Sequence, residues 1–263
     1  MTDADLEAPL FDFEQYATKD EAYDDWKSAL LFGNPGAGKS WLAGSAAELG
    51  KVLYLDTEGG AASAIRPWRK TGNITPIAIS SHKQLEFMVH KVLTEKHDYE
   101  TVVVDTVGTA QARAEKYFRS LPSMISPKTG EIDGFKVFGA LKDWLVAPTW
   151  RDDQDVIHGG LAWKLHEAPF RGILVAHDKQ DRDESGAVSI IPSLLGGAKD
   201  SLASVPDIVG YLTREEVDKQ IERVLIVQSG GALTTKNRFG LPKKIYQPSF
   251  SKIAELIEEG ASE

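Results

Sequence analysis

The eight residues from Gly33 to Ser40, GNPGAGKS, restrict what this chain can fold into more than any other feature. They satisfy the pattern G-x-x-x-x-G-K-[ST] of a phosphate-binding P-loop, which lies between the end of a strand and the start of a helix. The apolar run 28–32 before the loop is typical of a short buried strand, and 41–49 after it is typical of a helix. The chain is therefore predicted to have an α/β fold around this loop and to bind a nucleoside triphosphate.

Each residue type in the loop has a chemical role. The glycines let the backbone turn its N–H groups inward, where they form an anion-binding nest with the start of the helix. Lys39 would add a positive charge for the β- and γ-phosphates, and the Ser40 hydroxyl would hold Mg²⁺, so ATP and Mg²⁺ are the predicted cofactors. The predicted nucleotide-binding residues are Gly33, Asn34, Pro35, Gly36, Ala37, Gly38, Lys39, Ser40 and Trp41.

Composition narrows the class of protein. A chain of 263 residues with 42% hydrophobic and 26% charged residues suits one large α/β domain, and the absence of cysteine excludes disulfides and thiolate metal sites. An acidic N-terminus and the lack of an apolar run of about 18 residues predict a cytoplasmic protein without a membrane partner. A net charge of −9 disfavours a surface that is basic all over, which leaves nucleic-acid binding to local basic loops.

The acidic and aromatic residues 1–27 are predicted to form a cap segment, followed by the α/β core at 28–250 and a C-terminal helix and tail at 251–263. The predicted strands are 28–32, 51–56, 75–79, 101–105, 172–177, 207–212, 223–227, 232–235 and 244–247. The predicted helices are 41–49, 81–95, 108–120, 135–146, 154–166 and 251–259. The tightly linked strands of the last third predict an antiparallel extension on a parallel core.

Two acidic residues come directly after predicted strands. Asp105 ends a β-branched run that is typical of the middle of a parallel sheet, and we interpret it as the Walker B acid that orients Mg²⁺; a helix cap is the alternative. Thr106 follows where many motor ATPases have a glutamate, so another group must polarise water. Glu58 lies at the carboxyl edge of the sheet and is predicted to be the general base, with a solvated turn residue as the alternative.

Together, the P-loop, the carboxylate after the second strand, the Walker B acid without its own glutamate and a late Lys-x-Arg resemble the RecA-like ATPases. The stretch 236–240, KNRFG, is similar to a motif of the bacterial RadA branch and of small phage RecA-like proteins of the annealing and recombination class. The resemblance covers about 28–250 and implies a RecA-like P-loop core: a mostly parallel sheet flanked by helices, with an antiparallel C-terminal extension.

The resemblance also assigns expected roles outside the P-loop. Lys236 and Arg238 would project into the neighbouring subunit's ATP site and stabilise charge on the γ-phosphate, which requires a head-to-tail ring or filament. For these two residues a basic turn is the alternative. His177 ends the strand where relatives carry a polar group that senses the γ-phosphate, and a capped core histidine is the alternative.

In RecA-like proteins, two mobile loops bind single-stranded DNA. The corresponding segments here follow Gly108 and span about 178–199. Basic and aromatic groups on a pliable backbone suit sequence-independent binding, although acids in both segments leave a plain solvated surface as the alternative. The candidate DNA-binding residues are Arg113, Lys116, Arg119, Lys179, Arg182 and Lys199.

The leading hypothesis is a Mg²⁺-dependent ATPase that oligomerises on single-stranded DNA and promotes annealing or strand exchange. A single-strand-binding protein as an additional partner, and a bacterial host cytoplasm for a phage-encoded protein, follow only from the resemblance. The alternatives are a hexameric helicase or translocase and an ATP-gated binding protein that does not bind DNA. A metabolite phosphotransferase is the weakest alternative, because no arginine-rich lid for a second substrate is evident.

Overall fold

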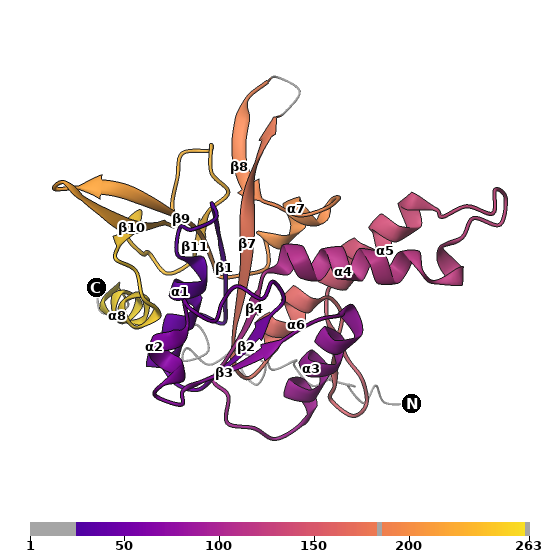
Figure 1. Cartoon of the computed structure of the whole chain (residues 1–263), viewed down its shortest axis with the longest axis horizontal. Helices are drawn as coiled ribbons and strands as arrows, with labels where there is room; N and C mark the ends of the chain where they lie inside the picture. Colours follow the sequence, from indigo (N-terminus) through magenta and orange to yellow (C-terminus); the bar gives the residue numbers. More distant parts are fainter. Residues whose placement is uncertain (1–24, 183–185, 261–263) are drawn as a thin grey trace, which may run out of the picture.

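The computed structural model describes residues 25–182 and 186–260, in which a central sheet lies between two layers of helices (Figure 1). The strand order across the sheet is β12-β10-β9-β1-β7-β4-β2-β3, with β11 paired to β9 and β8 paired to β7. The strand β7 therefore separates β1, which leads into the P-loop, from β4, which ends at Asp105. Both chemical motifs end at the same edge of the sheet because these three strands are parallel.

Six strands make the parallel part of the sheet and four extend it in the antiparallel sense. The parallel strands are β1 (Ser28–Gly33), β2 (Val52–Asp56), β3 (Ile74–Ala78), β4 (Thr101–Asp105), β7 (Arg171–Arg182) and β9 (Ile208–Val217). The antiparallel strands are β8 (Val188–Pro192), β10 (Gln220–Ile226), β11 (Lys236–Asn237) and β12 (Lys244–Tyr246). The predicted α/β class, with a mostly parallel sheet and an antiparallel C-terminal extension, is confirmed.

Helices cover both faces of the sheet. One face carries α3 (His82–Thr94), α4 (Val107–Arg119), α5 (Gly134–Val146), α6 (Leu161–Glu167) and α7 (Ala198–Leu202). The other carries α1 (Lys39–Gly44), the 3₁₀ helix η3 (Ser45–Glu48), α2 (Arg66–Arg69) and α8 (Phe250–Gly260). A further 3₁₀ turn, η4 (Pro122–Met124), lies between α4 and α5. The short helix α2 is not among the predicted elements.

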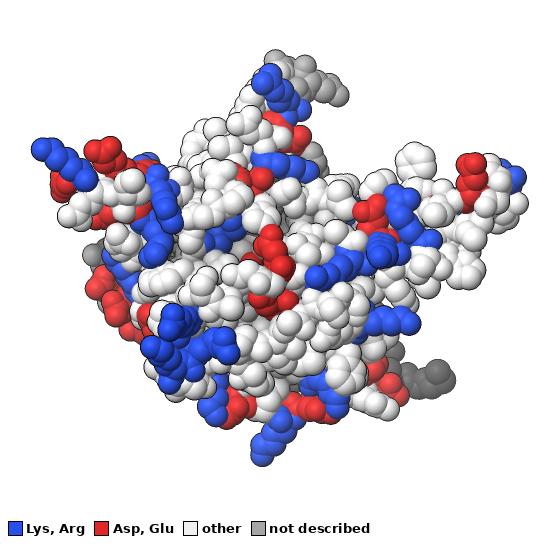
Figure 2. Space-filling model, in the orientation of Figure 1, with Lys and Arg blue, Asp and Glu red and all other residues white. Residues whose placement is uncertain are grey.

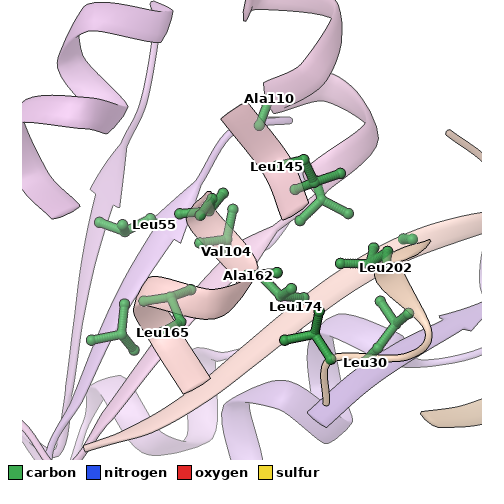
Figure 3. Close-up of a cluster of buried hydrophobic side chains, with 14 of the residues drawn as sticks. Leu30, Leu55, Val104, Ala110, Leu145, Ala162, Leu165, Leu174 and Leu202 are labelled. Carbon is green, nitrogen blue, oxygen red and sulfur yellow. The ribbon is translucent and has the colours of Figure 1, made fainter. Parts of the chain in front are cut away.

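The central strands have apolar side chains on both faces, as strands buried between two helix layers require. Along β1, Leu30 and Phe32 join the cluster under α3 to α7, whereas Ala29 and Leu31 join the cluster under α1, α2 and α8. Figure 3 shows part of the first cluster, where Leu174 of the sheet lies near Leu30 and Ala162. The alternation with period two fixes which residues belong to which half of the core.

The prediction of a helix at 154–166 is wrong in its first half. The chain forms a two-stranded hairpin there, β5 (Trp150–Arg151) with β6 (Ile157–His158), and α6 begins only at Leu161. A Cβ atom on Gly160 would lie 2.6 Å from the backbone nitrogens of Val146 and Ala147. The chain therefore passes the end of α5 too closely for a helix to continue through this point.

The predicted strand at 232–235 is displaced toward the C-terminus. The segment makes one bridge, between Leu233 and Ile190, and the paired strand β11 starts at Lys236. Because its register is set by tertiary contact with β8 and β9, its position could not be obtained from local apolar content.

The segment predicted as a second mobile loop, 178–199, is largely a β-hairpin. The strand β7 continues through Arg182 and pairs antiparallel with β8, and the pair projects from the body of the molecule as an arm (Figure 1). The first predicted loop, after Gly108, is the helix α4, which with α5 forms a second projection.

Candidate nucleotide-binding and catalytic site

The P-loop has the local geometry that phosphate binding requires. It joins β1 to α1, and a Cβ on Gly33 would lie 2.2 Å from the carbonyl oxygen of Leu212 on β9, so only glycine permits this approach. The first N–H bonded within α1 is that of Leu42, which donates to Gly38. The N–H groups of residues 38–41 lie outside the helical ladder and can donate to an anion.

Lys39 lies across the loop rather than in solvent. Its side chain is 6% exposed, and Nζ donates to the carbonyl oxygens of Gly33 at 2.7 Å and Asn34 at 2.9 Å. Burial lowers the pKa of Lys39, and the nearby carboxylates of Asp105, Asp178 and Glu58 partly offset this effect. The ammonium is thus held beside the anion nest, as its predicted role requires.

Asp105 ends β4 as predicted and lies beside the first turn of α1. Its carboxylate accepts a hydrogen bond from the hydroxyl of Tyr54, and the Ser40 side chain lies close enough to affect the pKa of Asp105. Asp105 is 3% exposed, and burial raises its pKa. Desolvation of a carboxylate beside a serine hydroxyl produces a site that gains from a bound cation.

These oxygen donors fit Mg²⁺. Mg²⁺ usually keeps several waters and is bound by one or two protein groups together with substrate phosphates. The hydroxyl of Ser40 would ligate the ion, and Asp105 would hold its water shell, so that the ion screens the charge of the phosphates. No group of three or more metal-binding side chains occurs in residues 25–182 and 186–260.

Two predicted catalytic residues from distant parts of the sequence meet next to the P-loop. His177, on β7, donates from Nε2 to Oε1 of Glu58 at a distance of 3.1 Å. The other ring nitrogen of His177, Nδ1, is buried and has no hydrogen-bond partner within the described part of the chain. The imidazole therefore depends on Glu58 for its polar contact and holds that carboxylate in place.

Asp56 shapes the loop that carries Glu58, a role that the sequence analysis missed. Its carboxylate accepts from the backbone N–H groups of Glu58 at 3.0 Å, Gly59 at 2.6 Å and Ala61 at 3.3 Å. An aspartate at a strand end followed by two glycines is a signal for such a turn. Tyr54 was also missed, because its contact with Asp105 depends on the pairing of β2 with β4.

Lys39, Glu58 and Asp105 line one cavity of about 260 Å³. It is bordered by the P-loop, Trp41, the loop after β2, Asp105, Thr106 and His177. A larger hollow of about 740 Å³ lies near the opposite edge of the sheet, where Tyr99 and Arg171 contribute to its lining. The smaller cavity is the candidate active site, because it holds the phosphate-binding loop and the aligned carboxylates.

Lys236 and Arg238 lie far from the P-loop of their own subunit. Lys236 pairs with Val209 of β9, which is level with Leu30, three residues before Gly33. At about 3.3 Å per residue, this position is about 10 Å below the carboxyl edge of the sheet. These side chains therefore do not reach the cavity beside Glu58 in the same chain.

Both basic side chains have partners within the chain. Lys236 Nζ donates to the carbonyl oxygen of Ser204 at 2.6 Å, and Arg238 Nη1 donates to Oδ1 of the buried Asp207 at 2.8 Å. Burial and the adjacent Arg238 charge lower the pKa of Lys236. Asn237 organises the turn that follows it, since its Oδ1 accepts from the backbone N–H groups of Phe239 and Leu241.

Three of the candidate DNA-binding residues have partners within the chain. Arg113 donates to the carbonyl oxygen of Ile79, Arg119 pairs with Glu115 at 2.8 Å, and Lys179 donates to the carbonyl oxygen of Leu194 at 2.7 Å.

Two other candidates remain available. The side chains of Lys116 on α4 and Arg182 on the β7–β8 arm make no hydrogen bond or ion pair with the described residues. Figure 2 shows basic side chains, interspersed with acidic ones, on the β7–β8 arm, on the projection formed by α4 and α5, and on the projecting β9–β10 hairpin. The side chain of Lys199 and residues 1–24 of the cap predicted at 1–27 lie outside the described residues. In the part of the chain that is described, no helix is long and apolar enough to span a membrane.

Replacing Asp105 with asparagine should make the nucleotide-free protein more stable at pH 7 while abolishing hydrolysis. Burial raises the pKa of Asp105, so the folded state binds its proton more tightly than the unfolded state does, and stability falls as the pH rises above 3.8. Asparagine removes this charge and can still accept from Tyr54. Thermal melting should show a higher Tm, by about 2–4 °C for each kcal/mol gained.

The matched control for this variant is Asp98→Asn. Asp98 is exposed and paired with Lys51, which lowers the pKa of its carboxyl, so the amide should not raise the Tm. The advantage of Asp105→Asn should shrink as the pH falls toward 3.8. A lower Tm for Asp105→Asn at pH 7 would contradict this account of the site.

Comparisons with known proteins add a family match to this geometry. Residues 26–149 match a family model described as an AAA domain, a stretch that contains the P-loop, Glu58 and Asp105 but ends before His177. No curated protein matches the chain. A KaiC-like protein from Pyrococcus horikoshii OT3 has 13% identity, with 84% of this chain and 89% of that protein covered and a TM-score of 0.42. The flagellar accessory protein FlaH from Methanocaldococcus jannaschii has 9% identity, with 84% of each chain covered and a TM-score of 0.43.

Proposed function

We propose that this protein is a Mg²⁺-dependent, RecA-like ATPase that oligomerises on single-stranded DNA and promotes annealing or strand exchange. The observation that carries the catalytic part is the hydrogen bond between Glu58 and His177 beside the P-loop. The bonded carboxylate lines a cavity that also holds Lys39 and Asp105, which supports a role for Glu58 in hydrolysis at the γ-phosphate.

In this proposal Glu58 acts as the general base. The carboxylate accepts a proton from the water whose oxygen attacks the γ-phosphorus, while the bond to the bridging oxygen breaks and ADP leaves. Lys39 stabilises the charge on the phosphates, and Ser40 and Asp105 hold Mg²⁺. His177 fixes the direction of the Glu58 carboxylate. Glu58 thereby takes the role of the glutamate that many motor ATPases have at the position of Thr106.

The charge stabilisation comes from a second subunit. Lys236 and Arg238 lie on the part of the sheet that is remote from their own P-loop, which favours a role in a neighbour's site. A contact that joins this surface to another subunit's P-loop is head-to-tail and generates a ring or a filament. Arg238 would then exchange its contact with Asp207 for the neighbour's γ-phosphate.

The β7–β8 arm is the proposed link to DNA. His177 and Arg182 lie on the same continuous strand, so a change at the Glu58 contact can be transmitted along β7 to the arm. Arg182 on the arm and Lys116 on α4 offer cations without partners in the described chain, as binding to a phosphate backbone requires.

Single-stranded DNA should raise the rate of ATP hydrolysis at low salt, and the effect should weaken as salt increases. The logarithm of the oligonucleotide binding constant, measured by fluorescence anisotropy across a salt series, should fall linearly with log[salt]. Arg182→Ala should flatten the slope by about 0.7, because one phosphate contact to a single strand is lost. Lys252→Ala on α8, which donates to the carbonyl oxygen of Tyr246, is the matched cation control and should leave the slope unchanged.

If DNA does not change the rate of ATP hydrolysis at low salt and no oligonucleotide binding is detected, the proposed binding to single-stranded DNA is refuted. The ATP-gated binding protein would then be the better description. Unwinding of a forked duplex would instead favour a helicase or translocase. The strand-annealing assay, with complementary labelled oligonucleotides, separates the proposed activity from both alternatives.

A further inference from the structure

A single arginine from the antiparallel extension lies against the P-loop. Arg223 is on β10, and its side chain crosses directly over Gly38. A Cβ atom on Gly38 would lie 2.8 Å from Arg223 Nε and 2.9 Å from Cδ, so the absence of a side chain there makes room for the arginine. The P-loop and the extension are thus packed together at this point within one subunit.

The guanidinium of Arg223 is stacked on an aromatic ring. Its central carbon lies 4.3 Å from the centroid of the Trp41 indole, and Trp68 packs edge-on against the same indole at 5.3 Å. Stacking of a guanidinium on a ring occupies its face and leaves its in-plane N–H groups free to donate. Arg223 is therefore held in position with its hydrogen-bonding edge available.

No anion within the described residues satisfies this cation. Arg223 makes no side-chain hydrogen bond or ion pair with residues 25–182 or 186–260, and the residue directly opposite it on β9 is Arg214. Burial lowers the pKa of Arg223, and the charge of Arg214 lowers it further. Two like charges opposite each other in a sheet are unfavourable unless an anion lies near them.

We propose that Arg223 binds the phosphate chain of the nucleotide held by its own subunit, on the α- and β-phosphate side of the P-loop. The inference rests on the proposed nucleotide binding and adds a second protein cation to it. Lys39, Ser40 and Asp105 line the cavity on the side assigned to Mg²⁺ and the γ-phosphate. Gly38 and Trp41 border the same cavity, and Arg223 crosses the loop at these two residues. Because the backbone of a P-loop cradles the α- and β-phosphates, this position favours a contact with that part of the phosphate chain.

Isothermal titration calorimetry with MgATP and MgADP tests this assignment. Arg223→Ala should raise the Kd of both nucleotides by about 10- to 100-fold. This change corresponds to the free energy that hydrogen bonds to a charged group typically contribute. Arg223→Lys should fall between Arg223→Ala and the unaltered protein, because lysine keeps the charge but loses the planar fork. Lys243→Ala is the matched control, an exposed cation just before β12, and should bind as the unaltered protein does.

The outcomes separate this inference from the function it rests on. Failure of the unaltered protein to bind either nucleotide would refute the proposed function itself. Normal binding by that protein and an unchanged Kd in Arg223→Ala would overturn the Arg223 assignment alone, as would a loss confined to MgATP, which would indicate a γ-phosphate contact. If Arg223→Ala does not fold, Arg223→Gln keeps the length of the side chain without its charge and should show the same loss.

Discussion

Glu58→Gln is expected to lower the rate of ATP hydrolysis by about 10²- to 10⁴-fold with little change in nucleotide affinity, the loss typical of a removed general base. Glutamine keeps the size of the side chain and can still accept from His177 Nε2, but it cannot take a proton from water. Steady-state hydrolysis, together with calorimetric MgATP binding, measures the two effects separately.

Two further variants test whether the loss of hydrolysis in Glu58→Gln is specific to the Glu58 carboxylate. Glu255→Gln on α8 changes an exposed glutamate away from the cavity and should leave hydrolysis unchanged. His177→Ala keeps the carboxylate and removes its partner, so its loss should be smaller than that of Glu58→Gln. Full activity in Glu58→Gln would eliminate the carboxylate as the base and leave its contact with His177 as a structural one.

Arg238→Ala is expected to reduce turnover by about 10³- to 10⁵-fold, the effect of removing an arginine finger, while MgATP binding persists. The guanidinium would act on charge that develops at the neighbour's γ-phosphate, so it contributes little to ground-state binding. Because Arg238 also pairs with the buried Asp207, thermal melting must accompany the kinetics. A large fall in Tm would indicate that the pair stabilises the fold.

Mixing two inactive variants tests whether the finger acts in trans. Lys39→Ala lacks the P-loop cation but keeps its finger, whereas Arg238→Ala keeps its P-loop and lacks the finger. In a randomly mixed oligomer, about a quarter of the interfaces would combine an intact P-loop with an intact finger, so hydrolysis should reappear. If the mixture stays as inactive as its components, although both variants fold and assemble, the finger does not act across an interface.

The strands of the parallel sheet were predictable because their signal is local. The segments 101–105 and 28–32 are apolar on both faces, and this pattern requires only that helices cover both sides. The helix predicted at 154–166 failed for the opposite reason. The backbone of Gly160 lies against the end of α5, and the hydrophobic pattern of 154–166 does not indicate this contact.

Some residues of the candidate site have a local sequence signal, and others do not. Lys39 and Asp105 were identified within their own motifs, and the structure places them at one cavity. The contribution of Asp56 to the loop of Glu58 has a local signal, whereas the position of Arg223 over Gly38 has none. Arg223 belongs to a strand whose sequence resembles any other strand of the extension.

The sequence by itself determined that a phosphate-binding loop follows the first strand of an α/β core, because that loop is made by eight consecutive residues whose backbone needs are met locally. Only the tertiary structure decided which side chains meet there. The insertion of β7 between β1 and β4 brings His177 to Glu58 across 119 positions of sequence. An alternating pattern specifies a strand and its faces, but the choice of its neighbours depends on packing between elements that are distant in the chain.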